Sequence, residues 1–257
     1  MEERFVVLLH MMEQSGADFI CLQEVTYKFL QMLFAASWVS EQYFVAVQEQ
    51  TGYFVVILSK WPGRCFEQPF QSRMGRALLI YEVQIMGEPL VVATTHLESL
   101  TNAPTRKLQL ELSLEILTPF RNMILCGDFN FTSEWRVEQK TLEPTLYSDV
   151  WLDLNGGRET FSMSKNLHYP SWRPDKIVVS RVSTWKAREM HRVGAFSIPS
   201  FQKDKWTAIE EDSTVRTPSD HMGFIAKFER AALEEADDVP AEVIAAALAE
   251  HEDRGHM

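Results

Sequence analysis

The sequence predicts an α/β protein in which mixed β-sheets have helices outside them. Helical patterns alternate with short apolar strands near the N-terminus, whereas closely spaced strands bounded by Gly and Pro dominate further along, and this mixture disfavours a purely parallel sheet. At 257 residues, 46% of them hydrophobic, the chain is long enough to bury one large core. One main domain is therefore expected.

The N-terminal segment predicts a helix, a strand and a second helix. Residues 4–14 carry apolar side chains at helical spacing, and Gly16 ends that pattern. The apolar stretch at 18–24 predicts a short strand that terminates in Glu24. Residues 28–36 show a helical pattern again.

Further along, short apolar runs predict β-strands. These runs are residues 43–48, 52–60, 77–85, 89–97, 123–128, 176–180 and 223–228. Gly87 to Pro89 is a candidate hairpin turn, and residues 103–117 form a long helical pattern that stops at Pro119. The stretches 131–169 and 184–218 are predicted to be loops.

The composition changes beyond Ala231, where Ala, Glu and Asp dominate. We therefore divide the chain into a domain at 1–230 and an acidic tail at 231–257, in which Pro240 could start a helix. Two interpretations of this tail stay open. It is either a solvated or partly disordered appendage, or a partner-binding helix with an apolar stripe formed by Val243, Ile244 and Leu248.

A net charge of −11 argues against binding a polyanion, but much of the charge lies in the tail. Residues 229–257 hold nine acids and two arginines, a net of −7, which leaves −4 of the −11 for residues 1–228. The total charge therefore does not exclude DNA as a partner.

Cysteine use and hydropathy predict a soluble, intracellular protein. The three cysteines form no disulfide pattern, and two of them lie inside apolar runs. No apolar run approaches the roughly 18 residues that a membrane span needs, and the N-terminus does not resemble a signal peptide.

Polar side chains able to do chemistry lie at the ends of four predicted strands. They are Glu24, His96, Asp128 with Asn130, and Asp220 with His221. A sheet holds such groups rigidly around a crevice where its strands end. Each one alone has an ordinary alternative: a solvated edge carboxylate, a structural histidine, or a turn formed by Gly-Asp-x-Asn.

Taken together, the motifs LQE, TTHLES, GDFN and SDH, in this order, resemble the endonuclease/exonuclease/phosphatase family of divalent-metal phosphodiesterases. GYFVVILSK, SRMGRALL, RKLQL and SDHMGFIAKF resemble the branch of this family that removes tyrosine from DNA 5′ ends. The resemblance covers roughly residues 4–229. It implies a four-layer α/β sandwich, with two mixed β-sheets packed face to face and helices outside.

The resemblance also implies a Mg²⁺ cofactor, for which Mn²⁺ could substitute. A phosphodiester is anionic, so attack by water requires neutralisation of growing negative charge, and Mg²⁺ prefers oxygen ligands. Glu24 would be the first metal ligand, and Asp220 would lie beside the metal, directly or through water. Asp128 would accept a proton from the attacking water or orient it, while Asn130 would hold that water or a phosphate oxygen.

The two histidines, His96 and His221, would donate hydrogen bonds to the phosphoryl oxygens. A charged His221 needs an orienting acid, and the resemblance gives that role to Asp175 in RPDKIVV, where Pro174 departs from the family pattern. Ser99 in HLES would lie near the phosphate, or else be a helix N-cap.

Several further side chains are candidates to contact the substrate. Arg73 and Arg76 could hold DNA phosphates, and Tyr53, Phe161 and Trp172 could line a wall for a base or a tyrosyl group, although core packing is an equal alternative for each aromatic ring. The family pattern has an Arg shortly after GDxN, whereas this sequence has no basic residue there until Arg136.

The resemblance further implies a strand bearing an Asn ahead of residues 4–14, and this strand is absent from the sequence. Its absence would leave a sheet without an inner strand and the site without that Asn.

Three hypotheses of function follow. The first is hydrolysis of 5′-phosphotyrosyl bonds, which frees DNA 5′ ends from covalent protein adducts in the nucleus or cytoplasm. The second is a related enzyme of the same fold, acting on other DNA, RNA, lipid or inositol phosphates. The third is a non-catalytic interaction protein that keeps the scaffold.

Overall fold

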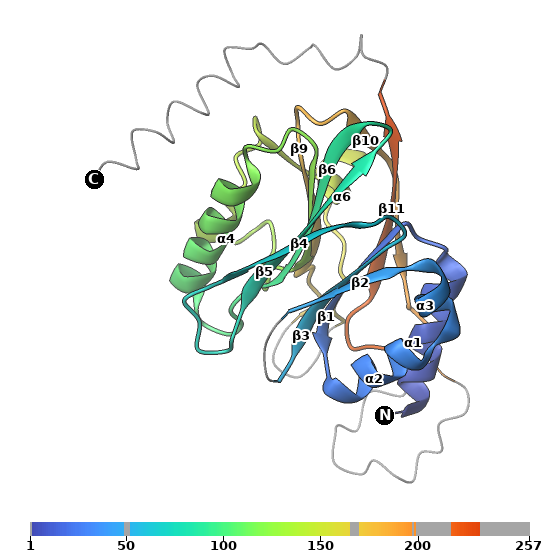
Figure 1. Cartoon of the computed structure of the whole chain (residues 1–257). Coiled ribbons are helices and arrows are strands. Elements are labelled where there is room, and N and C mark those ends of the chain that lie inside the picture. The colour runs from blue at the N-terminus through green and yellow to red at the C-terminus, as the bar shows by residue number, and fades with distance from the viewer. Residues whose placement is uncertain (1, 49–51, 165–169, 197, 199–216, 232–257) are drawn as a thin grey trace.

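Two β layers pack face to face with helices outside them, which confirms the predicted four-layer α/β sandwich (Figure 1). The structure is a computed structural model and describes residues 2–48, 52–164, 170–196, 198 and 217–231. All but the first residue of the predicted tail lies outside the described residues, so the helix and the partner proposed for it stay predictions.

The first layer is a six-stranded mixed sheet in the order β4-β5-β6-β7-β9-β8. Its strands are β4 (Gly63–Pro69), β5 (Ala77–Ile85), β6 (Glu88–His96), β7 (Met123–Asp128), β8 (Tyr147–Asp149) and β9 (Asp175–Ser180). The pair β6–β7 is parallel, and the others are antiparallel. Because parallel neighbours need a crossover connection, helix α4 (Ala103–Leu117) joins β6 to β7.

The second layer is divided into two antiparallel sheets. One contains β1 (Phe19–Val25), β3 (Phe54–Ser59) and β2 (Phe44–Val47), and the other pairs β10 (Trp185–Val193) with β11 (Gly223–Arg230). The resemblance implies a single mixed sheet here. Among the described strands, however, no hydrogen-bonded ladder joins the two sheets, so the layer is interrupted.

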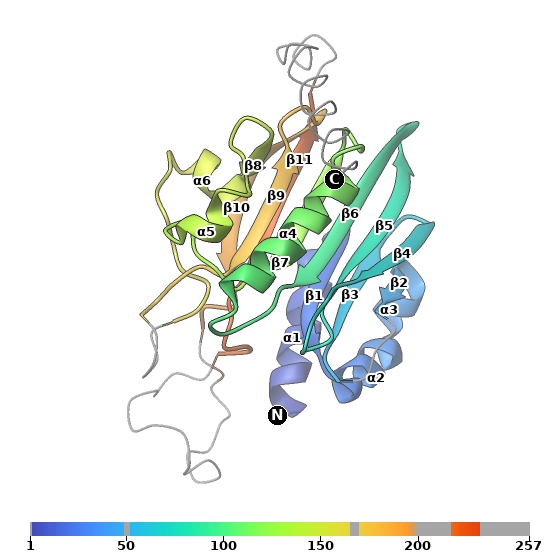
Figure 2. The same ribbon diagram turned by 90° about the vertical axis from the view of Figure 1, so that its left-hand side faces the viewer.

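Helices pack on the outer faces of the two larger sheets (Figure 2). The three-stranded sheet is covered by α1 (Glu2–Ser15), α2 (Tyr27–Ala35) and α3 (Ser37–Gln42). Thr26 caps α2 by accepting a hydrogen bond from the backbone N–H of Phe29 at 3.3 Å. On the other side α4 buries three leucines against the six-stranded sheet, Leu110, Leu114 and Leu117. The two remaining helices are short, α5 (Arg136–Gln139) and α6 (Val150–Leu154).

Alternate residues of β7 point into different cores. Met123 and Leu125 join the core beneath α4, whereas Ile124 joins the core between the two β layers. Side chains alternate between the two faces of a strand, so Asp128 lies on the same face of β7 as Ile124. Asp128 therefore points between the layers. The polar end of this buried strand is thus directed to the mouth of the inter-sheet core.

Gly127 permits a close approach of β6 to β7. Its φ is +152°, and a Cβ atom at this position would lie 2.0 Å from the carbonyl oxygen of Thr95. Any side chain there would push apart the two strands that end in His96 and Asp128. The glycine of the GDFN motif therefore sets the strand spacing beneath the polar groups.

Most elements predicted from the sequence are present, including the helix over 103–117 and all eight strands. The loop prediction for 184–218 is wrong at its start, where β10 lies. A bulge between Ala187 and Glu189 breaks the alternation of apolar and charged residues along β10, which hid the strand. The loop-rich prediction for 131–169 missed three short elements, α5, β8 and α6.

Two further elements had no prediction. The exposed edge strand β4 has few apolar residues to mark it, and the short helix α3 follows α2 almost directly. The predicted hairpin between β5 and β6 is present, with its turn at Met86 and Gly87. In the described part of the chain, no helix is long and apolar enough to cross a membrane.

Candidate active site

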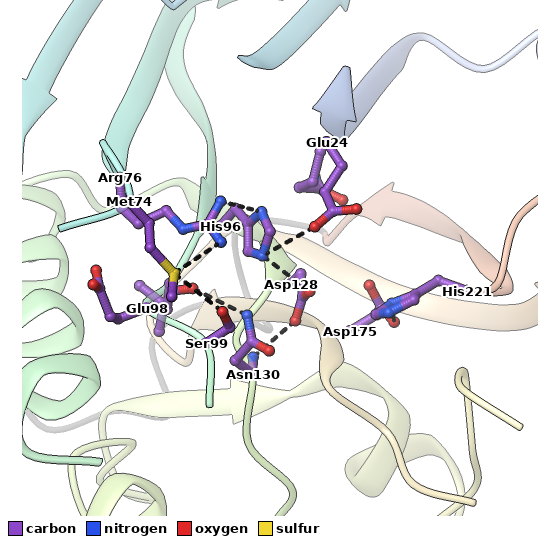
Figure 3. A network of polar contacts seen from close by, with 12 residues as sticks. Glu24, Met74, Arg76, His96, Glu98, Ser99, Asp128, Asn130, Asp175 and His221 are labelled. Carbon is purple, nitrogen blue, oxygen red and sulfur yellow. Dashed lines mark hydrogen bonds and ion pairs between the residues drawn. The ribbon is translucent and has the colours of Figure 1, made fainter. Parts of the chain in front are cut away.

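Three neighbouring strands of the six-stranded sheet bring a row of polar side chains together. His96 on β6 is the register partner of Asp128 on β7, and Asp128 is the partner of Asp175 on β9. Residues opposite one another in a sheet share a face, so all three point between the β layers (Figure 3). The Nε2 of His96 lies 3.4 Å from Oδ2 of Asp128.

Glu24 reaches this row from the opposite layer. It lies one residue before the end of β1 in a left-handed backbone conformation with φ +53°, at an irregularity in the pairing with β3 between Leu22 and Val25. A residue other than glycine rarely adopts this conformation, which is found at functional sites. The kink places Oε1 of Glu24 3.9 Å from Nε2 of His96 while the carboxylate stays 55% exposed.

His221 closes the row on the other side. Its Nδ1 lies 2.9 Å from Oδ2 of Asp175, and the backbone N–H of Met222 donates to the carbonyl of Ser162 at 2.7 Å. Burial alone would lower the pKa of His221, but the bond to Asp175 and the nearby acids raise it to about 10. His221 is therefore a cation at neutral pH, with Asp175 as its orienting acid.

Asp128 is buried and held by its own loop. Its Oδ1 accepts a hydrogen bond from the backbone N–H of Asn130 at 2.8 Å. Burial and the charge of Asp175 raise the pKa of Asp128 to about 7, against the opposing effect of His221. Its carboxyl therefore changes protonation state near neutral pH, as a general base requires. Asn130 itself has φ +53°, and its amide donates to the carbonyl of Leu97 at 3.0 Å.

His96 lies against Arg76, on the side of the ring away from the carboxylates. Arg76 Nη1 is 2.7 Å from Nδ1 of His96, which is 3% exposed. Burial, with the charges of Arg76 and His221, lowers the pKa of His96 to about 3. The two histidines of the site therefore differ at neutral pH, because His96 is neutral and His221 is charged.

A buried carboxylate, Glu98, organises the loop that carries Arg76. It accepts hydrogen bonds from the hydroxyl of Ser72 at 2.5 Å, from the backbone N–H of Arg73 at 3.2 Å and from Gln109 Nε2 at 3.1 Å. Arg106 Nη1 donates to the carbonyls of Glu98 and Leu100. Residues 72–76 and 98–100 are thus held as one unit beside the row.

Ser99 lies at the edge of this unit, where its hydroxyl contacts the sulfur of Met74 at 3.1 Å (Figure 3). The alternative that Ser99 is a helix N-cap is wrong, because α4 begins at Ala103 and its N-cap position is Asn102.

The candidate substrate contacts are distributed around the row. Tyr53 is 57% exposed and lines a recess with Arg76 and His96, and the exposed Arg73 lies in the same loop as Arg76. Backbone bridges join Met163 to both Trp172 and His221, so Trp172 is next to the row on the other side.

The surroundings of the other two aromatic candidates, Trp172 and Phe161, differ. Trp172 stacks on Trp135 with ring centroids 5.5 Å apart, and the two form an aromatic pair beside the site. The ring of Phe161 is covered by the guanidinium of Arg192 at 4.1 Å, so this face of Phe161 does not form a wall for a substrate.

Asp220 is not joined to Glu24 or Asp128 by any hydrogen bond or ion pair of the described residues. Its side chain is 71% exposed and lies 3.8 Å from Arg4 of α1. It does contribute to the negative potential that keeps His221 charged.

The donors at this site fit a hard cation with an open coordination shell. The described residues contain no group of three or more His, Cys, Asp or Glu side chains arranged to hold a metal ion. The site instead presents the carboxylates of Glu24 and Asp128 together, both next to Nε2 of His96. Mg²⁺ typically takes one or two carboxylates and completes its shell with water and substrate phosphate, so this donor set suits it.

A buried cluster of charges supports the strand that carries Asp175. Arg173 is fully buried and binds Glu159 through two bonds of 2.6 and 2.9 Å and Asp149 through one of 2.8 Å. Lys176 is also buried, and its Nζ lies 3.7 Å from Asp149. Among the described residues this Nζ has no hydrogen-bond partner.

Replacing Lys176 by methionine is expected to stabilise the protein at pH 7. Burial, together with the charge of Arg173, lowers the pKa of Lys176 from 10.5 to about 8, so the folded state resists its protonation. This penalty is fully present below pH 8 and disappears as the pH rises to 10.5, and it corresponds to roughly 3 kcal/mol. Urea unfolding of Lys176→Met should show a gain of about 1–3 kcal/mol at pH 7 that shrinks towards pH 10.5.

The exposed Lys140 provides the control, since Lys140→Met should change the free energy of unfolding little at either pH. A Lys176→Met variant that is less stable than wild type at pH 7 would contradict this interpretation.

Sequence reasoning missed the supporting residues Glu98, Arg106 and Arg173. Buried charges carry no local pattern, and their partners are distant in the chain. Each of the three lies inside a family-like motif, Glu98 in HLES, Arg106 in RKLQL and Arg173 in RPDKIVV, and these motifs were the available signals. Trp135 was also missed, because its role depends on stacking against Trp172 from another loop.

Comparison with known proteins agrees with this arrangement. A sequence model of the Endonuclease/Exonuclease/phosphatase family matches residues 3–221. No curated protein matches the chain by sequence.

Solved structures share the fold at low sequence identity. TDP2 from D. rerio, complexed with a single-strand DNA product, has a TM-score of 0.71 at 23% identity, over 89% of this chain and 92% of that one. Truncated TDP2 from Caenorhabditis elegans has a TM-score of 0.69 at 21% identity, over 88% and 90%. The human Nocturnin catalytic domain with bound sulfate has a TM-score of 0.68 at 17% identity, over 90% and 87%.

Proposed function

The chain belongs to the Endonuclease/Exonuclease/phosphatase family, and from this membership we propose that it hydrolyses 5′-phosphotyrosyl bonds at DNA ends with the help of Mg²⁺. Membership makes it a phosphoric diester hydrolase of a family that generally depends on divalent metals. The tyrosyl leaving group, the DNA polymer and the identity of the metal are the proposed parts.

The observation that carries this proposal is the convergence of acids and imidazoles from two sheets and the loop before β11. Glu24 comes from the three-stranded sheet, His96, Asp128 and Asp175 from the six-stranded sheet, and His221 from the loop before β11. Hydrolysis of a phosphodiester needs a base for water and positive charge for the phosphoryl oxygens. This set provides both.

Glu24 is the proposed metal ligand, because its carboxylate is the most exposed of the row. A bound Mg²⁺ would neutralise charge that develops on the phosphoryl and leaving oxygens. Asp220 would join through water, since it lies next to His221 in the chain and its side chain is largely exposed.

Asp128 is the proposed general base. Its carboxylate is fixed by the N–H of Asn130, which leaves Oδ2 to accept the proton of the attacking water. The side-chain oxygen of Asn130 would orient this water, while its amide is already engaged with Leu97.

The two histidines would act as different kinds of donor. His221, charged and held by Asp175, would donate a charge-assisted hydrogen bond to a phosphoryl oxygen. His96, which is neutral, would donate a second bond from Nε2. Both bonds would strengthen as negative charge grows in the transition state.

The choice of a tyrosyl-DNA substrate is supported by the HLES and MGR motifs and by the fold shared with TDP2. Arg73, Tyr53 and Ser99 would contact the DNA end and its adduct on one side of the row, and Trp172 would do so on the other. Action on DNA ends would place the protein in the nucleus or the cytoplasm.

A panel of substrates tests the proposal. Purified protein with Mg²⁺ should release tyrosine from a 5′-phosphotyrosyl oligonucleotide faster than it cleaves an abasic-site duplex, a poly(A) RNA or an inositol phosphate. Faster cleavage of another substrate of the panel would support hydrolase activity but would contradict the proposed tyrosyl-DNA substrate. A folded protein that cleaves none of them would favour the third hypothesis, a non-catalytic interaction protein.

A further inference from the structure

We propose that Arg76 is a positioning residue, which holds His96 in the tautomer with its proton on Nε2 and directs that proton into the site. The catalytic consequence rests on the proposed function. The tautomer itself is a property of the protein alone.

The contact between the two side chains determines where the proton lies. A guanidinium has five N–H donors and no acceptor, so a 2.7 Å contact from Arg76 Nη1 requires a lone pair on Nδ1 of His96. A neutral imidazole with a lone pair on Nδ1 carries its proton on Nε2. That Nε2 faces Asp128 at 3.4 Å and Glu24 at 3.9 Å, so the proton points into the row of catalytic groups.

Arg76 is itself held firmly enough to impose this choice. Its carbonyl accepts a hydrogen bond from the N–H of Phe70 at 3.0 Å, and Gln48 Nε2 donates to the carbonyl of Gly75 at 3.1 Å. The second terminal nitrogen of Arg76 contacts the sulfur of Met74 at 3.7 Å (Figure 3).

The guanidinium also has an unusual environment for a residue that would only bind DNA. Its Nε is buried and has no hydrogen-bond partner among the described residues. Burial lowers the pKa of the group, while three carboxylates around it favour the cation: Asp128, Glu24 and Glu98. A phosphate contact alone would not require a side chain that is buried against His96.

The opposite tautomer would be unproductive. With its proton on Nδ1, His96 would direct a lone pair from Nε2 towards the two carboxylates, and it would offer no hydrogen bond to a phosphoryl oxygen. Groups that orient a functional imidazole through its other nitrogen fix both its tautomer and its ring position. Arg76 fits this role from the Nδ1 side, as Asp175 does for His221.

Nitrogen NMR of histidine-labelled protein tests the tautomer directly. In the folded, metal-free wild type at neutral pH, His96 should show a pyridine-type shift for Nδ1 and a pyrrole-type shift for Nε2. Arg76→Met should mix or reverse these shifts. Arg64→Met is the control, because Arg64 is an exposed residue of β4 that pairs with Glu82. It should leave these shifts unchanged. A protonated Nδ1 in the wild type would overturn the proposal, whether or not the protein is an active enzyme.

Kinetics separate positioning from direct contact with DNA. The substrate is a p-nitrophenyl phosphodiester, which has no flanking DNA phosphates. Arg76→Met should lower kcat on it by roughly 10–100-fold, the size of loss typical when a residue that orients a metal ligand is removed. KM should change little, because Arg76 acts through His96 and not on the substrate. Arg76→Lys, which keeps the charge and a donor, should recover part of the loss.

A double-mutant comparison completes the test. In a His96→Ala background, Arg76→Met should cause little further loss, since there is no imidazole left to position. Fully additive losses, or a change confined to KM and to DNA substrates, would show that Arg76 acts on the substrate instead and would overturn the proposal.

Discussion

Asp128→Asn is expected to lower kcat for phosphodiester hydrolysis by about 10²–10⁴-fold, because it removes the general base and keeps its shape. Asparagine can still accept the hydrogen bond from the N–H of Asn130, so the loop and the strand end should not move. Asp18→Asn, at a largely exposed site paired with Lys60, is the matched control and should retain wild-type activity.

The same substitution should stabilise the metal-free fold. Burial and the charge of Asp175 raise the pKa of Asp128 from 3.8 to about 7, so the folded state loses stability as the pH rises from about 3.8 to 7, and the full cost is present above pH 7. An amide has no such cost. Thermal unfolding at pH 8 without metal should therefore show a higher Tm for Asp128→Asn than for wild type.

Opposite changes in activity and stability are typical of a catalytic group held in a strained electrostatic environment. Hydrolysis near the wild-type rate by the variant would remove Asp128 from the mechanism. Loss of stability together with activity would instead make it a structural residue.

Arg173→Met is expected to destabilise the protein by about 3–5 kcal/mol, because it leaves buried carboxylates without their partner. Arg173 is fully buried and makes three short bonds to Glu159 and Asp149. Its removal would also loosen the start of β9, since Nη1 of Arg173 donates to the carbonyl of Asp175 at 3.4 Å.

Urea unfolding at pH 7 measures this loss, and two further variants test its cause. Arg188→Met, at a half-exposed ion pair with Glu229, should cost less than about 1 kcal/mol. Adding Asp149→Asn and Glu159→Gln to Arg173→Met should recover part of the stability, because the unpaired charges are then absent. An Arg173→Met variant as stable as wild type would contradict the role of this cluster.

Elements with a regular pattern could be predicted from the sequence. The strand at 123–128 is an uninterrupted apolar run that ends in Gly127 and Asp128, and the helix at 103–117 has a clear stop at Pro119. β10 could not be predicted, because its bulge at Ala187 shifts the apolar side chains out of step. The division of the second layer depends on pairing between distant strands, which local patterns do not encode.

The candidate site could be predicted in part for the same reason. Glu24, His96 and Asp128 each lie at or next to the end of an apolar strand, so their position at one edge follows from the strand pattern. The assignment of Asp175 came from the family pattern and agrees with its 2.9 Å contact to His221, despite the preceding Pro174. The partners of these groups could not be predicted, because they depend on strand register and on loops.

The pairing of Arg76 with His96 is the clearest example. The two residues lie on different segments and meet because β5 and β6 are paired in a fixed register, with Leu78 opposite Thr95. The sequence indicated only that each could contact a phosphate.

Binding of Mn²⁺, followed by electron paramagnetic resonance in the metal-free full chain, tests most directly whether these groups form a metal-dependent centre. Mn²⁺ can report on a Mg²⁺ site because both accept carboxylate oxygens. Wild type should bind Mn²⁺ in competition with Mg²⁺. Glu24→Gln should weaken binding at least about tenfold, because the charge of the ligands tunes affinity, and Glu41→Gln on the exposed face of α3 should not. Equal binding by wild type and Glu24→Gln, or no binding by folded wild type, would contradict the account.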